Sequence, residues 1–113
     1  MITAKFYQKP SHGSIHMKLQ GHANAAPKGE DLICSAATML AYTVAQAVQF
    51  MYKDGKLKKK PQIILKEGSA TIIATPTEDG YAEALHTYWV AQCGIHVLQH
   101  NYPQNVKLEY LKV

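Results

Sequence analysis

The 113-residue sequence has little that would direct it to a membrane or to an oxidising compartment. No uninterrupted apolar run approaches the roughly 18 residues that indicate a membrane-spanning helix. Residues 1–6 lack the apolar core and the cleavage site of a signal peptide. There are only two cysteines, and in a reducing compartment a pair of cysteines is more often two thiols than a disulfide. We therefore expect a cytoplasmic protein without a membrane segment.

The motifs of several enzyme classes are also missing. The sequence has no glycine-rich phosphate loop, which argues against a nucleotide-dependent enzyme. It has no Gly-x-Ser-x-Gly elbow, which argues against the corresponding serine hydrolases. His96 and His100 have the spacing of two zinc ligands on one helix face, but no third ligand is evident. We therefore expect neither a metal nor a cofactor.

What is present fits one ordinary globular domain over residues 1–113, with 47% apolar and 18% charged residues. The net charge is +4, and part of it comes from a lysine cluster between residues 53 and 60. Such a cluster can attract RNA or another anionic partner by counterion release, or it can be a solvated connection. No aromatic residue is interleaved with those lysines, so we do not expect direct nucleic-acid binding.

The spacing of apolar residues predicts five strands and two helices. In order, the expected elements are strands at 2–7 and 14–19, a helix from 31 to about 53, strands at 62–66 and 70–75, a helix from 77 to about 102, and a strand at 106–113. The order strand-strand-helix-strand-strand-helix-strand predicts an α+β two-layer sandwich, with both helices on one face of a mixed or antiparallel sheet. The second helix should bury a stripe made of Tyr81, Leu85, Tyr88, Ala91, Ile95, Leu98 and Tyr102.

The most informative stretch joins the second expected strand to the first expected helix. Asp31 is a good N-cap residue, and Cys34 would then lie in the first turn, near the positive end of the helix dipole. That position favours the thiolate, which is the nucleophilic form of cysteine. A cysteine in an apolar run is also commonly a small buried hydrophobe. The residues themselves leave both interpretations open.

A histidine stands on the other side of the same loop. His22 follows directly on the second strand, where a rigid element would hold it in place, although a surface histidine would look the same in sequence. Gly21 and Gly29 bracket the loop, and glycine adopts backbone conformations that other residues avoid. We interpret these two glycines as hinges of a flap that closes over an extended substrate.

The stretch resembles the signature of the ribosomal-processing cysteine protease family, Prp. The matching residues are Gly-His-Ala at 21–23, Gly-Glu-Asp-Leu-Ile-Cys at 29–34 and Ser-Ala-Ala at 35–37. Two positions depart from the family pattern: Thr38 stands where a serine is common, and Ser35 stands where an alanine often follows the cysteine. Thr38 keeps a hydroxyl, so a hydrogen bond made at that position would survive.

The resemblance implies a cysteine endopeptidase with a Cys34–His22 dyad. Asp31 would cap the helix or orient His22, and Thr38 would support the site. Backbone N–H groups at the start of the helix are candidates for stabilising the oxyanion. The implied substrate is a large-subunit ribosomal protein precursor, cut after an aromatic pair and before a small residue, and the family also implies a homodimer. The alternative is a non-catalytic ribosome- or RNA-associated module in which Cys34 is structural.

Overall fold

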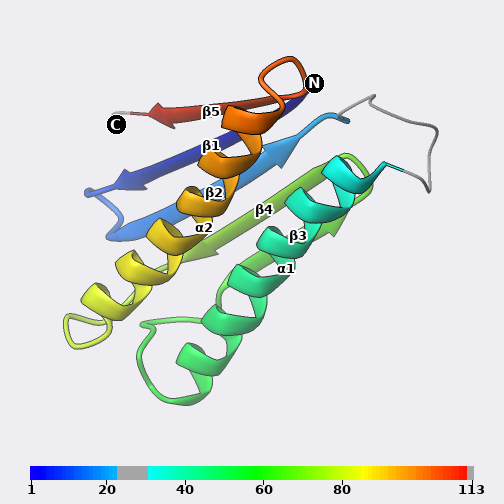
Figure 1. Cartoon of the computed structure of the whole chain (residues 1–113). Helices are drawn as coiled ribbons and strands as arrows, with labels where there is room; N and C mark the ends of the chain where they lie inside the picture. The colour runs from blue at the N-terminus through cyan, green and yellow to red at the C-terminus, as the bar shows by residue number, and fades with distance from the viewer. Residues whose placement is uncertain (23–30, 112–113) are drawn as a thin grey trace.

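A computed structural model, which describes residues 1–22 and 31–111, shows a five-stranded sheet with two helices on one side of it (Figure 1). The elements are β1 (Ile2–Lys9), β2 (Ser14–Gln20), α1 (Leu32–Lys53), β3 (Gln62–Lys66), β4 (Ser69–Ala74), α2 (Tyr81–Asn101) and β5 (Val106–Leu111). Their order and their two layers confirm the predicted α+β sandwich.

The strands lie in the order β3-β4-β2-β1-β5. The pairs β3–β4, β4–β2 and β2–β1 are antiparallel, whereas β1 and β5 are parallel, with Ile2 opposite Val106. The sheet is therefore mixed, and β3 and β5 form its two edges. Antiparallel neighbours can be joined by a short turn, whereas parallel neighbours need a long connection. The chain reaches β5, the parallel neighbour of β1, through the segment after β4 that contains α2.

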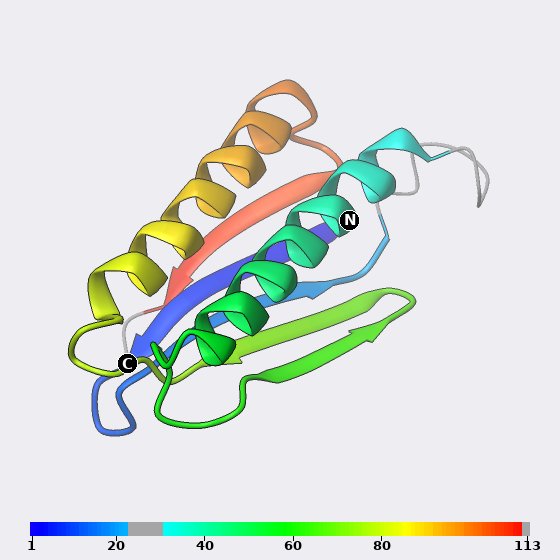
Figure 2. The ribbon, with the colours of Figure 1, turned by 90° about the horizontal axis from the view of Figure 1, so that it is seen from below.

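Both helices lie on the same face of the sheet (Figure 2). Alternate strand residues face this helical layer and build the core, as the period of two requires. The sheet contributes Ile2, Ala4, Phe6, Ile15, Met17, Leu19, Ile72 and Val106 to this core. The opposite surface of the sheet, which we call the open face, carries the intervening and mostly polar residues. No helix covers the open face in the part of the chain that the structure describes (Figure 1).

The helix α1 is the largest contributor to the helical layer. Its buried side is made of Ile33, Ala37, Ala41, Val44, Ala45, Val48 and Met51. By length and hydropathy alone, α1 is long and apolar enough to cross a membrane. The sequence did not predict this, because polar residues interrupt the apolar run. Its small residues instead pack against the sheet and α2, as in the core helix of a globular domain.

The predicted stripe of α2 is correct in its middle and wrong at its ends. Tyr88, Ala91 and Ile95 are buried, and the Tyr88 hydroxyl donates a hydrogen bond to the Ile72 carbonyl (3.1 Å). Tyr81, Leu85 and Tyr102 are exposed instead. The helix begins only at Tyr81, whose hydroxyl turns away to donate to Gln8 Oε1 (2.7 Å). The small residue Ala84 takes the core position there.

One histidine is buried on the open face. The His16 ring stacks on Tyr7 with ring centroids 4.5 Å apart, and its Nε2 lies 2.7 Å from Ser14 Oγ. Burial, together with the positive charges of Lys9, Lys18 and His12, lowers the pKa of His16 to about 4. The folded protein therefore keeps this imidazole neutral at pH values where an exposed histidine takes up a proton.

We expect the free energy of unfolding to decrease as the pH falls from about 6.5 to about 4. In that window the unfolded chain binds a proton at His16 that the folded chain does not, so acid favours unfolding. Urea unfolding at pH 7, 5.5 and 4.5 measures the slope, and His16→Gln should flatten it. Equal slopes for the two proteins would contradict the assignment of this effect to His16.

Candidate active site

The first turn of α1 is held by Asp31. This residue is 8% exposed, and its Oδ1 accepts hydrogen bonds from the N–H groups of Ile33 and Cys34, each at 3.0 Å. The predicted cap is thus confirmed. Cys34 lies two residues into the helix, half-buried and packed against the core. Its sulfur is at the helix end where the dipole favours an anion.

The same hydrogen bonds change the expectation for the oxyanion. The N–H of Ser35 donates to the Asp31 carbonyl (3.1 Å), and the N–H groups of Ile33 and Cys34 donate to the Asp31 side chain. These three amides of the first turn are already engaged by Asp31. The role of N–H groups around Cys34 in stabilising an oxyanion stays a prediction, and for these amides it requires that the oxyanion compete with the cap for the same N–H groups.

His22 is placed by the turn between β3 and β4. The N–H of Gly21 donates to the Gly68 carbonyl (2.9 Å), which ties the end of β2 to that turn. The His22 imidazole then lies directly over Gly68: a Cβ added to Gly68 would be 2.8 Å from Nε2 and 3.3 Å from Cε1. Gly68 also has φ +74°, a backbone conformation that disfavours residues with a side chain. This glycine makes room for the ring and is needed by the turn itself.

Gly21 is similarly constrained. Its φ is +97°, and a Cβ at this position would collide with the backbone carbonyl of Met1. The residue therefore fixes the close approach of the end of β2 to the start of β1. The second predicted hinge, Gly29, lies outside the described residues.

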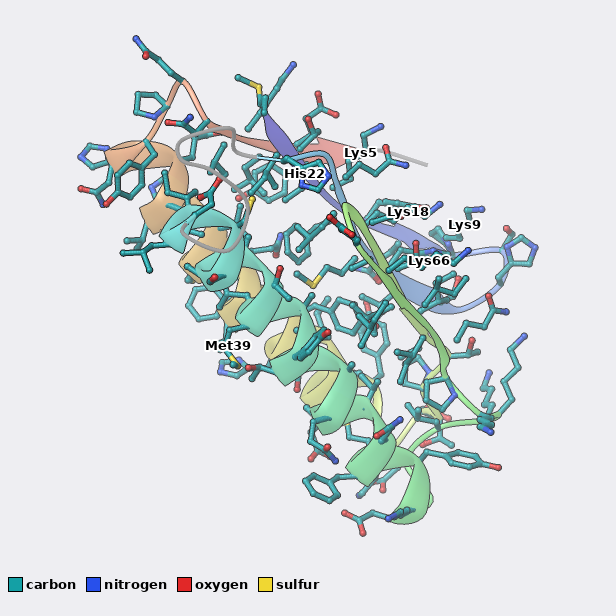
Figure 3. The ribbon with its side chains drawn as sticks, turned by 90° about the vertical axis from the view of Figure 1, so that its right-hand side faces the viewer. Lys5, Lys9, Lys18, His22, Met39 and Lys66 are labelled. Atoms are coloured by element: carbon teal, nitrogen blue, oxygen red, sulfur yellow. The ribbon has the colours of Figure 1, made fainter. Side chains whose placement is uncertain are left out.

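Cys34 and His22 line one groove, with a volume of about 790 Å³. The groove runs between the first half of α1 and the β3–β4 turn, and residues at the end of β2 form part of its wall. Figure 3 shows His22 where the chain leaves β2, beside the β3–β4 turn and opposite α1. Among the residues that line the groove are Ile2, Leu19, Gly21, His22, Asp31, Cys34, Thr38, Met39, Tyr42, Leu65, Glu67, Gly68 and Ser69.

The structure therefore gathers Cys34, His22, Asp31 and Thr38 around one cavity. Thr38 follows Cys34 by one helical turn, on the same side of α1. The contribution of the β3–β4 turn was not predicted from the sequence. No local signal reveals that turn, because it reaches the site through the pairing of β4 with β2.

The other candidates from the sequence stay apart from the groove. Among the described residues, no three His, Cys, Asp or Glu side chains are grouped as metal ligands would be. His96 and His100 are exposed on α2. Cys93 is exposed on α2 as well, because the buried residues of this helix lie on its other side.

Comparison with known proteins agrees with this geometry. The family model of the cysteine protease Prp matches residues 1–107. The essential ribosomal processing protease Prp from S. aureus, solved with a covalently linked product peptide, superposes with a TM-score of 0.72 at 19% identity, covering 98% of this chain and 100% of the other. The same protease with a substrate peptide gives 0.68 at 18% identity, with coverages of 98% and 100%.

A structure of SMU.848 from Streptococcus mutans gives a TM-score of 0.69 at 21% identity, covering 98% of this chain and 94% of the other. No curated protein matches the sequence significantly. At these identities the structural likeness shows the fold, and the family match shows the class of enzyme. With its cysteine at the start of α1 and a matching sequence over residues 1–107, the chain belongs to the family of the cysteine protease Prp.

Proposed function

We propose that this cysteine protease matures a ribosomal protein precursor in the cytoplasm, using Cys34 as the nucleophile and His22 as its proton acceptor. The observation that carries the proposal is the shared groove, which brings a cysteine at a helix start and a histidine at a strand end to one cavity. The structural neighbour from S. aureus is a ribosomal processing protease that binds a peptide. That precedent supports the substrate class.

The chemistry is acyl transfer to sulfur. His22 accepts the thiol proton of Cys34, and the thiolate attacks the scissile carbonyl carbon. When the peptide C–N bond breaks, the imidazolium returns the proton to the leaving amine, and a thioester to Cys34 remains. Water, deprotonated by the neutral imidazole, then attacks the thioester and releases the new carboxylate. His22 thus carries one proton in each half-reaction, and the dyad ends as it began.

Asp31 contributes first as the cap that positions Cys34. Its Oδ1 already accepts two backbone hydrogen bonds, and its side chain lines the groove together with His22. We propose that any effect of Asp31 on His22 is electrostatic and secondary to the cap. Thr38 supports the site through its position in the same wall, one turn after Cys34.

The groove suits an extended peptide with apolar side chains. Leu19, Leu65, Met39 and Tyr42 supply apolar surface in its walls, which fits an aromatic pair before the cleaved bond. The strand β3 lies at the edge of the sheet beside the groove. A substrate strand can therefore pair with the outer side of β3 by main-chain hydrogen bonds while its side chains enter the groove.

A cleavage assay tests this function. The intact protein is incubated with a peptide that spans an aromatic-aromatic-small junction and, separately, with a peptide of the same composition in scrambled order. Mass spectrometry should find one cut, before the small residue, in the first peptide alone. Failure to cut that peptide, under conditions where Cys34 is rapidly alkylated at pH 6.5, would contradict the substrate and leave the nucleophile standing.

We also propose that two copies associate through the outer surface of the helices. Large apolar side chains outside the groove are exposed there: Phe50, Trp89, Val90 and Val97. Exposed large apolar side chains that gather on one surface commonly mark interfaces.

Trp89→Glu should shift the protein from dimer to monomer in sedimentation experiments, because it places a charge among these apolar side chains. Lys58→Glu, in the connection that follows α1, adds a negative charge elsewhere and should leave the dimer intact. An unchanged sedimentation coefficient for Trp89→Glu would place the interface on another surface.

A further inference from the structure

The open face of the sheet carries cationic side chains in an ordered array. The strand register sets three rows across it: Lys66, Ser69, Gln20, Thr3 and Lys107; then Ile64, Thr71, Lys18, Lys5 and Glu109; then Gln62, Ile73, His16 and Tyr7. Lys9 continues the open-face side of β1 beyond Tyr7. Figure 3 shows Lys5, Lys9, Lys18 and Lys66 on the side of the sheet that faces away from α1.

These cations are close together and poorly neutralised. Lys5 and Lys18 are direct cross-strand partners, an arrangement that destabilises a sheet because like charges repel. Within the described part of the chain, no carboxylate forms an ion pair with Lys5, Lys9 or Lys18. The one carboxylate in the three rows, Glu109, is 3.1 Å from Lys107. A ligand of negative charge would relieve this repulsion.

A basic hollow extends the array at one end. It has a volume of about 250 Å³, and the strands and the connection after α1 line it together. Its lining is Lys9, His12, Ser14, His16, Lys59, Lys60, Gln62, Ile73 and Thr75. Lys59 and Lys60, at the end of the lysine cluster, thus meet the open face in space. Hydroxyl and amide groups that can contact phosphate stand beside the cations.

We propose that the open face and this hollow bind the backbone of single-stranded RNA. Tyr7 lies between Lys5 and Lys9 along β1, and the Lys18 ammonium is 5.9 Å from its ring centroid. Aromatic rings among cations are typical of single-strand binding surfaces. No aromatic residue accompanies residues 53–60 in the sequence, which argued against RNA, but the fold brings Tyr7 to the array from β1. All the basic chain residues other than histidine are lysines, which favours phosphate contacts over base recognition.

Fluorescence anisotropy with a labelled 15-nucleotide oligouridine tests the proposal over a range of salt concentrations. The face variant is Lys5→Gln/Lys18→Gln, and the matched control is Lys53→Gln/Lys58→Gln, which removes the same charge outside the array. The face variant should lose about ten-fold in affinity at low salt, and its log–log salt slope should decrease by about 1.4, or roughly 0.7 per phosphate contact. The control should stay within about two-fold of the intact protein.

The other outcomes decide against the proposal. Equal losses in both variants would mean that only net charge matters, and no binding by the intact protein would exclude the site. The intact protein could instead bind vesicles that contain anionic lipid and not bind RNA. If the face variant loses this vesicle binding, the array is assigned to a membrane surface. Dissociation of the dimer in the face variant would assign it to a second copy. Because neither Lys5 nor Lys18 lines the groove, the face variant should cut a short peptide normally, so this inference and the protease function fail independently.

Discussion

Cys34→Ala is expected to lower peptide cleavage by at least about 10³-fold, to the level of the uncatalysed reaction. Removing the sulfur removes the atom that forms the thioester, and no neighbouring group in the described wall of the groove replaces it. The hydroxyl of Ser35 is one residue away, but it donates to the Asp31 carbonyl (3.2 Å). The initial rate of peptide cleavage, followed by mass spectrometry, measures the loss.

Cys93→Ala is the matched control for this experiment. Cys93 is exposed on α2 and does not line the groove, so its removal should leave cleavage unchanged. Both alanine variants should unfold at urea concentrations close to that of the intact protein, since neither side chain is fully buried. Substantial cleavage by Cys34→Ala would show that the nucleophile is another residue.

Gly68→Ala is expected to reduce cleavage by about 100-fold although residue 68 has no side chain to contribute to the chemistry. The added methyl group would be 2.8 Å from Nε2 of His22, so the imidazole must move. In the proposed dyad a displaced imidazole no longer reaches the thiol, and a shift of about 1 Å is enough for a loss of this size. The loss should appear in kcat more than in KM, because the ring acts on the reacting atoms.

Gly55→Ala separates this effect from backbone strain. Gly55 has φ +75°, almost the same as Gly68, but an added Cβ would have no atom within 4 Å. Both variants should lose about 1 kcal/mol of unfolding free energy, whereas Gly55→Ala should cut peptide at the normal rate. Equal activity in the two variants would mean that His22 does not act from its position over Gly68.

Local patterns predicted the elements and half of the site. Alternation marked the strands, and Asp31 marked the start of α1, because both signals act over a few residues. The Gly-His-Ala and Cys34 motifs pointed to the two residues of the proposed dyad, which line one groove. The order of the strands, by contrast, depends on pairings between distant segments, so the sequence could not show that Gly68 lies under His22 or that Lys5 lies opposite Lys18.

The errors have the same origin. Tyr81 and Leu85 fit the apolar spacing of the helix, but both are exposed. In the first turns of α2 the buried position is occupied by Ala84, whose small side chain fits there. The amides near Cys34 looked available in sequence, and only the geometry of the cap shows that Asp31 engages them. In each case the spacing or the motif was read correctly. A contact that the sequence does not show then determined which side chain is buried or which N–H group is engaged.

The parallel pairing of β1 with β5 has a consequence for the protein during its own synthesis. The segments that build the groove, from β1 to β4, leave the ribosome before α2 and β5 do. Until β5 arrives, the outer side of β1 has no neighbouring strand, and an unpaired edge invites pairing with other chains. The nascent protease thus passes through a stage in which its groove segments are complete but its sheet is open, and synthesis of the last strand ends that exposure.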